Sequence, residues 1–312
     1  MTAERKALLQ IHLCVLLWGF TAILGKLITL SALPLVWWRM LLVVAALALV
    51  PRVWVAIRHM PRQLTLAYSA IGALVALHWL TFYGAIKLAN ASVGAACIAL
   101  AAPFTALVEP WLTGAHFSRR DLALGLAVLP GVALVVGGVP DGMRIGIFVG
   151  ALSALLVAVF GSLNKRLVNH GEPLAITALE LGAGAIVLTL LAPLCARWLP
   201  LLADQAFALP AARDAVLLVT LALACTLLPY ALALVALRHM SAFAAQLVVN
   251  LEPVYAIVLA IVLLNEQREL GAAFYVGVVI ILGAVFVHPL LSRPQRATAP
   301  EALGAGEAKL ID

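Results

Sequence analysis

One apolar stretch carries a carboxylate at a depth where hydrocarbon is expected. Residues 241–266, SAFAAQLVVNLEPVYAIVLAIVLLNE, are apolar enough to cross a bilayer, yet Asn250 and Glu252 lie near the middle. An ionisable group inside hydrocarbon costs about 3 kcal/mol even on the mildest insertion scale, so it normally faces a bundle interior, a partner or a water-filled path. Glu252 is therefore a candidate for contact with a substrate or a coupling proton. The alternative is structural pairing with a neighbouring helix.

Pro253, directly after Glu252, predicts a kink in the same stretch. Because proline has no N–H, it leaves the carbonyl of Val249 without its helical partner at membrane depth. On an unbroken helix Asn250 and Glu252 are about 200° apart, so both can face one cavity only if the proline unwinds that turn. Tyr255 shares a face with Glu252. We interpret Pro253 as a candidate for gating geometry, and Asn250, Glu252 and Tyr255 as candidates for substrate contact.

Two further charges lie inside apolar runs. Arg39 follows Trp37 and Trp38, which are typical of an interfacial aromatic belt, and lies about two turns into its run. Its guanidinium could attract a substrate carboxylate or lock an outer gate against a carboxylate; the alternative is snorkelling to the surface. Glu180 occupies the nearly symmetric position about two turns into the seventh run. If either residue is a gate residue, the other is its natural counterpart.

Aromatic residues in several runs are suited to lining a cavity for an amphipathic solute, because they combine apolar surface with polar tips. The alternative is that they pack against lipid or one another. His78 could titrate near neutral pH, although one membrane histidine is weak evidence for proton coupling. The candidate lining residues are Trp18, His78, Trp79, Tyr83, Tyr230 and Tyr255.

No motif for catalysis or metal binding is present in the sequence. We find no HExxH, nucleophile elbow, P-loop or paired-acid pattern, and the four cysteines lack metal or redox spacing. We therefore expect no cofactor, no metal and no enzymatic activity. Two alternatives to a transporter stay open: a membrane-embedded enzyme, which would need clustered catalytic residues, and an accessory membrane subunit, which would not need polar residues at midplane depth.

The composition is that of a membrane protein. Hydrophobic residues make up 65% of the 312, charged residues 11%, and the mean hydropathy is +1.11. Such a chain has room for about ten spanning helices of roughly 20 residues. The net charge of +6 comes mostly from Lys and Arg in short loops, so we expect no nucleic-acid partner. The predicted spans are 9–28, 32–50, 65–86, 91–113, 121–138, 145–165, 173–195, 215–237, 241–264 and 270–290.

The loop charges also predict an orientation, because Lys and Arg concentrate on the side of the N-terminus. The positive-inside rule then places both termini in the cytoplasm. The longest loop, about 196–214, could hold a short interfacial segment. Residues 292–312 are small and polar and contain Pro and Gly, which predicts a disordered cytoplasmic tail.

The two halves repeat each other. Lys26 matches Lys165, and, past the longer loop of the second half, Pro103 matches Pro253. Five spans in each half invert the second half, an arrangement that many secondary transporters use to build two gates around a midplane site. The predicted units are 1–140 and 141–291. The kink at Pro103 and Pro253 would be shared, whereas Glu252 aligns with an alanine. Glu109, in a second Glu-Pro pair, is a candidate inner-side gate or ion-pair residue.

Together these features resemble the EamA-type transporters of the drug/metabolite transporter superfamily. The residues that carry the resemblance are Trp18-Gly19, Lys26, Arg39, the Ala-rich spans around Pro103 and Pro253, Leu264-Asn265-Glu266, Gly271, Gly277 and Gly283. One departure is Thr113-Gly114-Ala115-His116, where an acidic residue is common.

The resemblance implies an all-α membrane protein with ten transmembrane helices, built as two inverted-topology five-helix repeats. It further implies a carrier in a bacterial inner membrane that exports amino acids or related small metabolites and is driven by a gradient. The expected partners are a small-molecule substrate, protons as the coupling ion, and the lipid bilayer.

Overall fold

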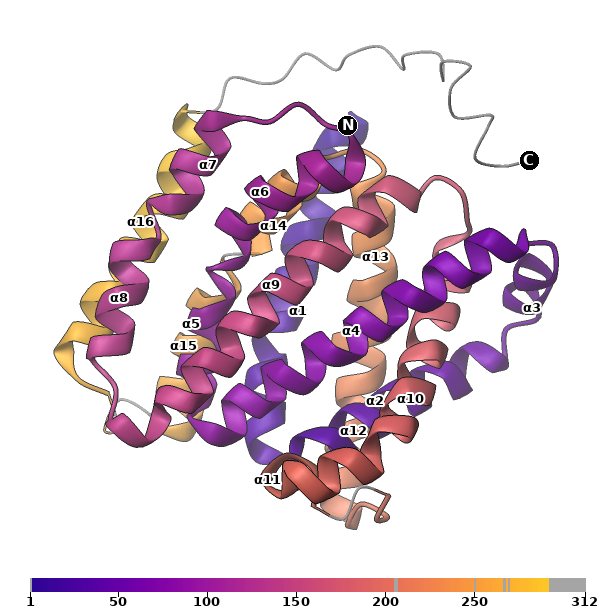
Figure 1. Cartoon of the computed structure of the whole chain (residues 1–312), viewed down its shortest axis with the longest axis horizontal. Coiled ribbons are helices and arrows are strands. Elements are labelled where there is room, and N and C mark those ends of the chain that lie inside the picture. The colour runs from indigo at the N-terminus through magenta and orange to yellow at the C-terminus, as the bar shows by residue number, and fades with distance from the viewer. Residues whose placement is uncertain (1, 205–206, 250, 266–267, 269, 292–312) are drawn as a thin grey trace.

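The computed structural model describes residues 2–204, 207–249, 251–265, 268 and 270–291, and every regular element in this part of the chain is a helix. The predicted tail and Asn250 lie outside the described residues. Figure 1 shows the helices as one bundle, with α16 beside α7 and α8 at one edge and α3 at another. The first half comprises α1 (Ala3–Leu27), α2 (Ala32–Ala48), α3 (Pro51–Arg58), α4 (Arg62–Leu88), α5 (Ala91–Ile98), α6 (Ala101–Thr113), α7 (Arg119–Leu126) and α8 (Leu129–Gly137).

The second half follows the same order. A 3-10 turn, η1 (Asp141–Met143), leads into α9, and a π-helical turn, η2 (Leu223–Leu227), joins α12 to α13. Its α-helices are α9 (Arg144–Leu167), α10 (Pro173–Trp198), α11 (Pro200–Ala203), α12 (Ala212–Ala222), α13 (Leu228–Leu237), α14 (Ala242–Val249), α15 (Glu252–Leu264) and α16 (Ala272–Leu291). The short helix α11 lies in the predicted 196–214 loop.

Fewer than ten of the described helices qualify as membrane-spanning by length and composition. Within the described ranges, 7 helical segments are long and apolar enough to cross a bilayer, or 8 if α2 and α3, which meet at 93°, form one span. The α7–α8 pair is interrupted between its helices, and the described apolar part of α16, Ala272–Gly283, is short. The structure therefore supports a multi-pass helical membrane protein without confirming ten spans.

The helix is interrupted for a short turn at each predicted kink, although Ala91–Thr113 and Ala242–Leu264 each remain one span. The fourth span divides into α5 and α6 just before Pro103, and the corresponding span of the second half divides into α14 and α15 just before Pro253. Both broken spans end in the left-handed conformation, at Gly114 (φ 73°) and Asn265 (φ 57°). The same break and the same cap thus occur in both halves.

Each half packs its first helix on the broken span of the other half. In this exchange α1 contacts α13 and α15, while α9 contacts α4 and α6. The α4 helix also packs on α10, and α8 packs on α16 (Figure 1). The two halves therefore interlock, and the region between them is built from both.

The crossing of α8 and α16 depends on two glycines. A Cβ placed on Gly131 would lie 2.5 Å from the Gly277 carbonyl oxygen, and one placed on Gly277 would lie 2.3 Å from the Gly131 carbonyl oxygen. We expect Gly131→Ala to destabilise the protein by about 1–3 kcal/mol, because the backbones must separate. Gly137→Ala in the same helix is the control, since nothing lies within 4 Å of its Cβ position. Equal melting temperatures for the two variants in detergent would contradict this packing.

Candidate functional site

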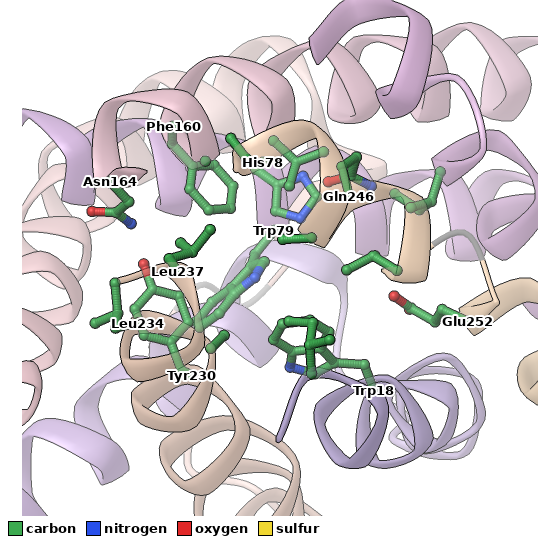
Figure 2. Close-up of a pocket in the computed structure, with 18 of the residues that line it drawn as sticks. Trp18, His78, Trp79, Phe160, Asn164, Tyr230, Leu234, Leu237, Gln246 and Glu252 are labelled. Carbon is green, nitrogen blue, oxygen red and sulfur yellow. The ribbon is translucent and has the colours of Figure 1, made fainter. Parts of the chain in front are cut away.

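A cavity lies between the two halves of the bundle. It holds about 950 Å³ of unfilled space, part of it open to solvent, and its walls come from α1, α2, α4, α5, α9, α13, α14 and α15. Figure 2 shows the labelled side chains converging on this space from helices of both halves, with the carboxylate of Glu252 directed into it. Most of the wall is apolar, and the polar atoms are few and placed at separate points. Such a lining suits a small amphipathic ligand.

The structure brings together most of the residues that the sequence suggested for substrate contact. Two candidates lie elsewhere: Tyr83 is buried just behind the wall, and Tyr255 is 38% exposed, with its Cβ at the position where Gly19 leaves room. The position of Tyr255 corrects the expectation that it shares the cavity with Glu252: its side chain lies against α1 at Gly19 and is partly exposed. The candidates that line the cavity are Trp18, Arg39, His78, Trp79, Tyr230 and Glu252.

Arg39 is held inside the bundle, so the snorkelling alternative is wrong. Only 2% of its surface is exposed. The guanidinium donates from Nε to Thr226 Oγ1 at 2.5 Å, from Nη1 to the Tyr83 hydroxyl at 2.9 Å and from Nη2 to the Cys225 carbonyl at 3.4 Å. Its Cζ also lies 3.8 Å from the centre of the Trp79 ring, a cation–π contact. Arg39 is thus fixed in place by neutral groups and keeps its charge available to the cavity.

The acceptors for Arg39 come from the π-helical turn η2. Pro229 has no N–H to bond the carbonyl four residues earlier, which is that of Cys225, so this carbonyl is free for the guanidinium. The Thr226 hydroxyl also donates to Leu221 at 2.6 Å across the widened turn. π-Helical turns inside α-helices occur frequently at functional sites. Sequence reasoning missed Thr226 and Cys225, although Pro229 signalled a free carbonyl.

His78 is anchored through one ring nitrogen. Its Nδ1 lies 2.9 Å from the Ser153 carbonyl oxygen, and the Ser153 hydroxyl donates to the His78 carbonyl at 3.0 Å. A proton on Nδ1 satisfies the carbonyl, which leaves Nε2 as the acceptor. The ring lies between Phe82 and Phe160, with centroids 6.2 and 5.3 Å away. His78 therefore offers the cavity one hydrogen-bond acceptor on a fixed ring.

Glu252 faces Arg39 across the cavity without pairing to it. The two groups interact electrostatically, but among the described residues the one salt bridge joins Arg144 to Asp141 at the surface. Neither carboxylate oxygen of Glu252 has a hydrogen-bond partner in the described part of the chain, and Arg39 is the one charged group that acts on it there. The cavity therefore contains a cation and an acidic group that are each open to a third partner.

Two polar wall residues were not selected from the sequence. The Nε2 of Gln246 is buried and lacks a partner within the described ranges, and so does the Oδ1 of Asn164. Gln246 lies in the same polar-bearing stretch as Glu252, so its position at membrane depth was a usable signal. Asn164 lies near the end of α9, where a polar residue is ordinary, so nothing in the sequence distinguished it.

Glu180 lies behind the wall, in contact with Tyr230. The Tyr230 hydroxyl donates to Glu180 Oε2, and the Asn164 side-chain amide donates to the same oxygen at 3.4 Å. Glu180 itself does not line the cavity. The arrangement parallels that of Arg39, since in each half a charged residue of the second long helix contacts aromatic residues of the third.

Glu109 joins the two halves near the start of α14. Its carboxylate accepts the backbone N–H of Ala242 at 2.8 Å and that of Phe243 at 2.7 Å. These N–H groups belong to the first turn of α14 and have no partner within their own helix. Lys165 acts on the same carboxylate electrostatically and donates to the Leu237 carbonyl at 2.8 Å. Glu109 thus caps a helix of the other half, and its role as an inner-side gate stays a prediction.

We expect Glu109→Gln to loosen the start of α14. A neutral amide offers one acceptor oxygen in place of two, and loss of a helix cap costs about 1 kcal/mol, which corresponds to about fivefold faster opening. Hydrogen–deuterium exchange at Ala242 and Phe243 measures this change. The control is Glu172→Gln, because Glu172 caps its own helix α10 through Ala175 N at 2.9 Å. Faster exchange at α14 in both variants would show a general loss of stability instead.

Comparison with known proteins adds two findings. A family model described as the EamA-like transporter family matches residues 5–137 and again residues 144–288. A solved crystal structure is similar in fold, with a TM-score of 0.65 and 17% sequence identity, over 93% of this chain and 98% of that chain. At this identity the likeness concerns the fold alone. The search among curated proteins gave no match.

Proposed function

Because the chain belongs to the EamA-like transporter family, whose model matches both halves, we propose that it is a secondary active exporter of amino acids or related small metabolites. It works by alternating access in a bacterial inner membrane, with ten spans arranged as two inverted five-helix repeats and with both termini cytoplasmic. Export and the coupling to protons rest on the resemblance of the sequence. The substrate class rests also on the cavity.

The observation that carries the proposal is the pair Arg39 and Glu252 in one cavity. Buried charges are costly unless they are paired, and these two are directed at the same space without pairing to each other. A solute with a carboxylate and an ammonium group satisfies both at once: the guanidinium holds the carboxylate and Glu252 accepts from the ammonium. The apolar wall then contacts the remainder of the solute. This is the chemistry of an amino acid.

The breaks in both halves support alternating access. The wall of the cavity includes the first helices α1 and α9 together with α5, α14 and α15 from the broken spans, so movement at either break changes its shape. Pro103 and Pro253 supply the hinges. Glu109 holds one end closed by bonding across the two halves. Opening that end requires these two bonds to break.

The proposal is tested by comparing metabolites in cells that overexpress the protein and cells that overexpress Glu252→Gln at the same level. An exporter depletes its substrate inside and enriches it in the medium, and the substrate should carry both an amino and a carboxyl group. Identical metabolite profiles for the two strains would contradict the proposed transport function. A transported solute without an amino group would remove the assigned role of Glu252.

A further inference from the structure

Two buried oxygen atoms at Glu180 and its neighbour lack a hydrogen-bond donor among the described residues. Glu180 is fully buried, and its Oε1 has no partner among the described residues; the same is true of the neighbouring Asn164 Oδ1. Both unpartnered atoms are acceptors. Oε2, by contrast, accepts from Tyr230 and from the Asn164 amide. Two buried acceptors without a donor raise the free energy of the folded protein. A proton on Oε1 makes that oxygen a donor.

Among the described residues no cation takes the place of that proton: Lys165 of α9, next to Asn164, donates to the Leu237 carbonyl, and His78 of α4 is held by Ser153. Of the helices that pack on α10, α4 brings Tyr68, whose hydroxyl donates to the Leu167 carbonyl at 2.8 Å. From α13 come Tyr230 and the end of the helix, where Arg238 donates to the carbonyls of Val168 and Gly171. On α2 lies Arg39, which already donates hydrogen bonds to Thr226, Tyr83 and Cys225. The charged residues of α3 are exposed, and α11 has none.

A chain of contacts links Glu180 to the cavity. The ring of Tyr230 lines the cavity while its hydroxyl holds Glu180. The Tyr230 ring meets the Trp79 ring edge-on at 6.1 Å, and Trp79 carries the Arg39 guanidinium on its face. Figure 2 shows Tyr230 and Trp79 next to each other in the wall. A solute bound to Arg39 therefore acts on Trp79, and Trp79 contacts the ring that carries the Tyr230 hydroxyl.

We propose that Glu180, with Tyr230 and Asn164, is the binding site of the coupling proton, and that Glu252 serves the solute instead. When the proton leaves, the O–H bond at Oε1 breaks, and the proton passes to water that reaches Glu180 when the wall opens at Asn164 and Tyr230, the two lining residues that contact it. The carboxylate that remains keeps its bonds from Tyr230 O–H and Asn164 N–H. Solute and proton are thereby linked through Tyr230. This inference rests on the proposed transport function.

Infrared spectroscopy of the purified protein in lipid tests the site without a substrate. We expect a C=O stretching band of a protonated carboxylic acid that disappears as the pH rises. Because Glu109, Asp214 and Glu252 are also buried, the Glu180 band is isolated as the difference between the spectra of the wild-type protein and of Glu180→Gln. The spectrum should be unchanged in Asp141→Asn, which removes an exposed carboxylate (side chain 86% exposed). In Tyr230→Phe, which keeps the ring, the band should persist to higher pH because the phenol no longer stabilises the carboxylate. A difference spectrum between the wild-type protein and Glu180→Gln that shows no titrating band would overturn the proposal.

Proteoliposomes test the linkage, with a mixture of common amino acids as the probe. In Glu180→Gln we expect exchange across the membrane to continue, while stimulation by an imposed pH gradient falls at least about tenfold, within the usual range of coupling between sites. Undiminished stimulation in this variant would overturn the proton site. So would a wild-type protein driven by a sodium gradient but not by a pH gradient. If the wild-type protein moves no amino acid, the proposed function fails, and the infrared result still decides whether Glu180 holds a proton.

Discussion

Glu252→Gln is expected to abolish gradient-driven accumulation of substrate in proteoliposomes and to leave the fold intact. The substitution keeps the shape of the side chain and replaces the carboxyl group with an amide, which cannot become a carboxylate. A hydrogen bond to a charged group contributes about 1.5–3 kcal/mol, so the loss corresponds to about 10- to 150-fold in binding of an ammonium-bearing solute. The expected melting temperature is close to that of the wild-type protein, because Glu252 has no partner in the described part of the chain.

The matched control for Glu252→Gln is Glu4→Gln, which removes an exposed carboxylate from the first turn of α1. This control should transport like the wild-type protein. Normal flux with unchanged pH dependence in Glu252→Gln would remove Glu252 from the mechanism. Binding lost together with a large drop in melting temperature would instead assign it a structural role.

The second large effect is expected for Arg39→Lys. Lysine keeps the positive charge but lacks the planar fork, so it cannot reach Thr226, Tyr83 and the Cys225 carbonyl together. It also loses the stacking on Trp79. We expect a loss of about 2–4 kcal/mol in the free energy of unfolding from these bonds and a fall in transport of about 100-fold, because the charge no longer points at the cavity.

Transport by Arg39→Lys should be measured below its own melting temperature, so that the two effects are separated. Arg213→Lys, at an exposed position at the start of α12, provides the control for the same chemical change. Wild-type transport in Arg39→Lys would show that any cation at this depth suffices. The assigned fork geometry would then be irrelevant to function.

Much of the helical framework could be predicted from the sequence. Apolar runs and the prolines at 103 and 253 located the spans and their two breaks, because both signals are local. The count of ten spans was not confirmed, since the α7–α8 segment is interrupted and the described apolar part of α16 is short. Hydropathy identifies segments that can lie in the hydrocarbon core of a membrane. It does not show whether one continuous helix forms each segment.

The site was predicted in part. Arg39, His78 and Glu252 share a cavity, as buried polar groups in a bundle were expected to do. Tyr255 was wrongly placed, because its side chain packs against α1 at Gly19, a contact between the two halves. The roles of Ser153 and Thr226 could not be predicted, since each depends on a helix from the other half. Such contacts are properties of the assembled bundle.

The distance along the chain between Arg39 and its partners has a consequence for biosynthesis. Arg39 and Thr226 are 187 residues apart, and Cys225 is equally remote. At a synthesis rate of about 5–20 residues per second, the guanidinium waits about 10–40 s in the translocation machinery or the membrane before η2 exists. During that interval Tyr83 is the one of these three hydrogen-bond partners that has already been synthesised. Premature release of the N-terminal half would leave a charged helix without its acceptors, exposed to quality-control proteases.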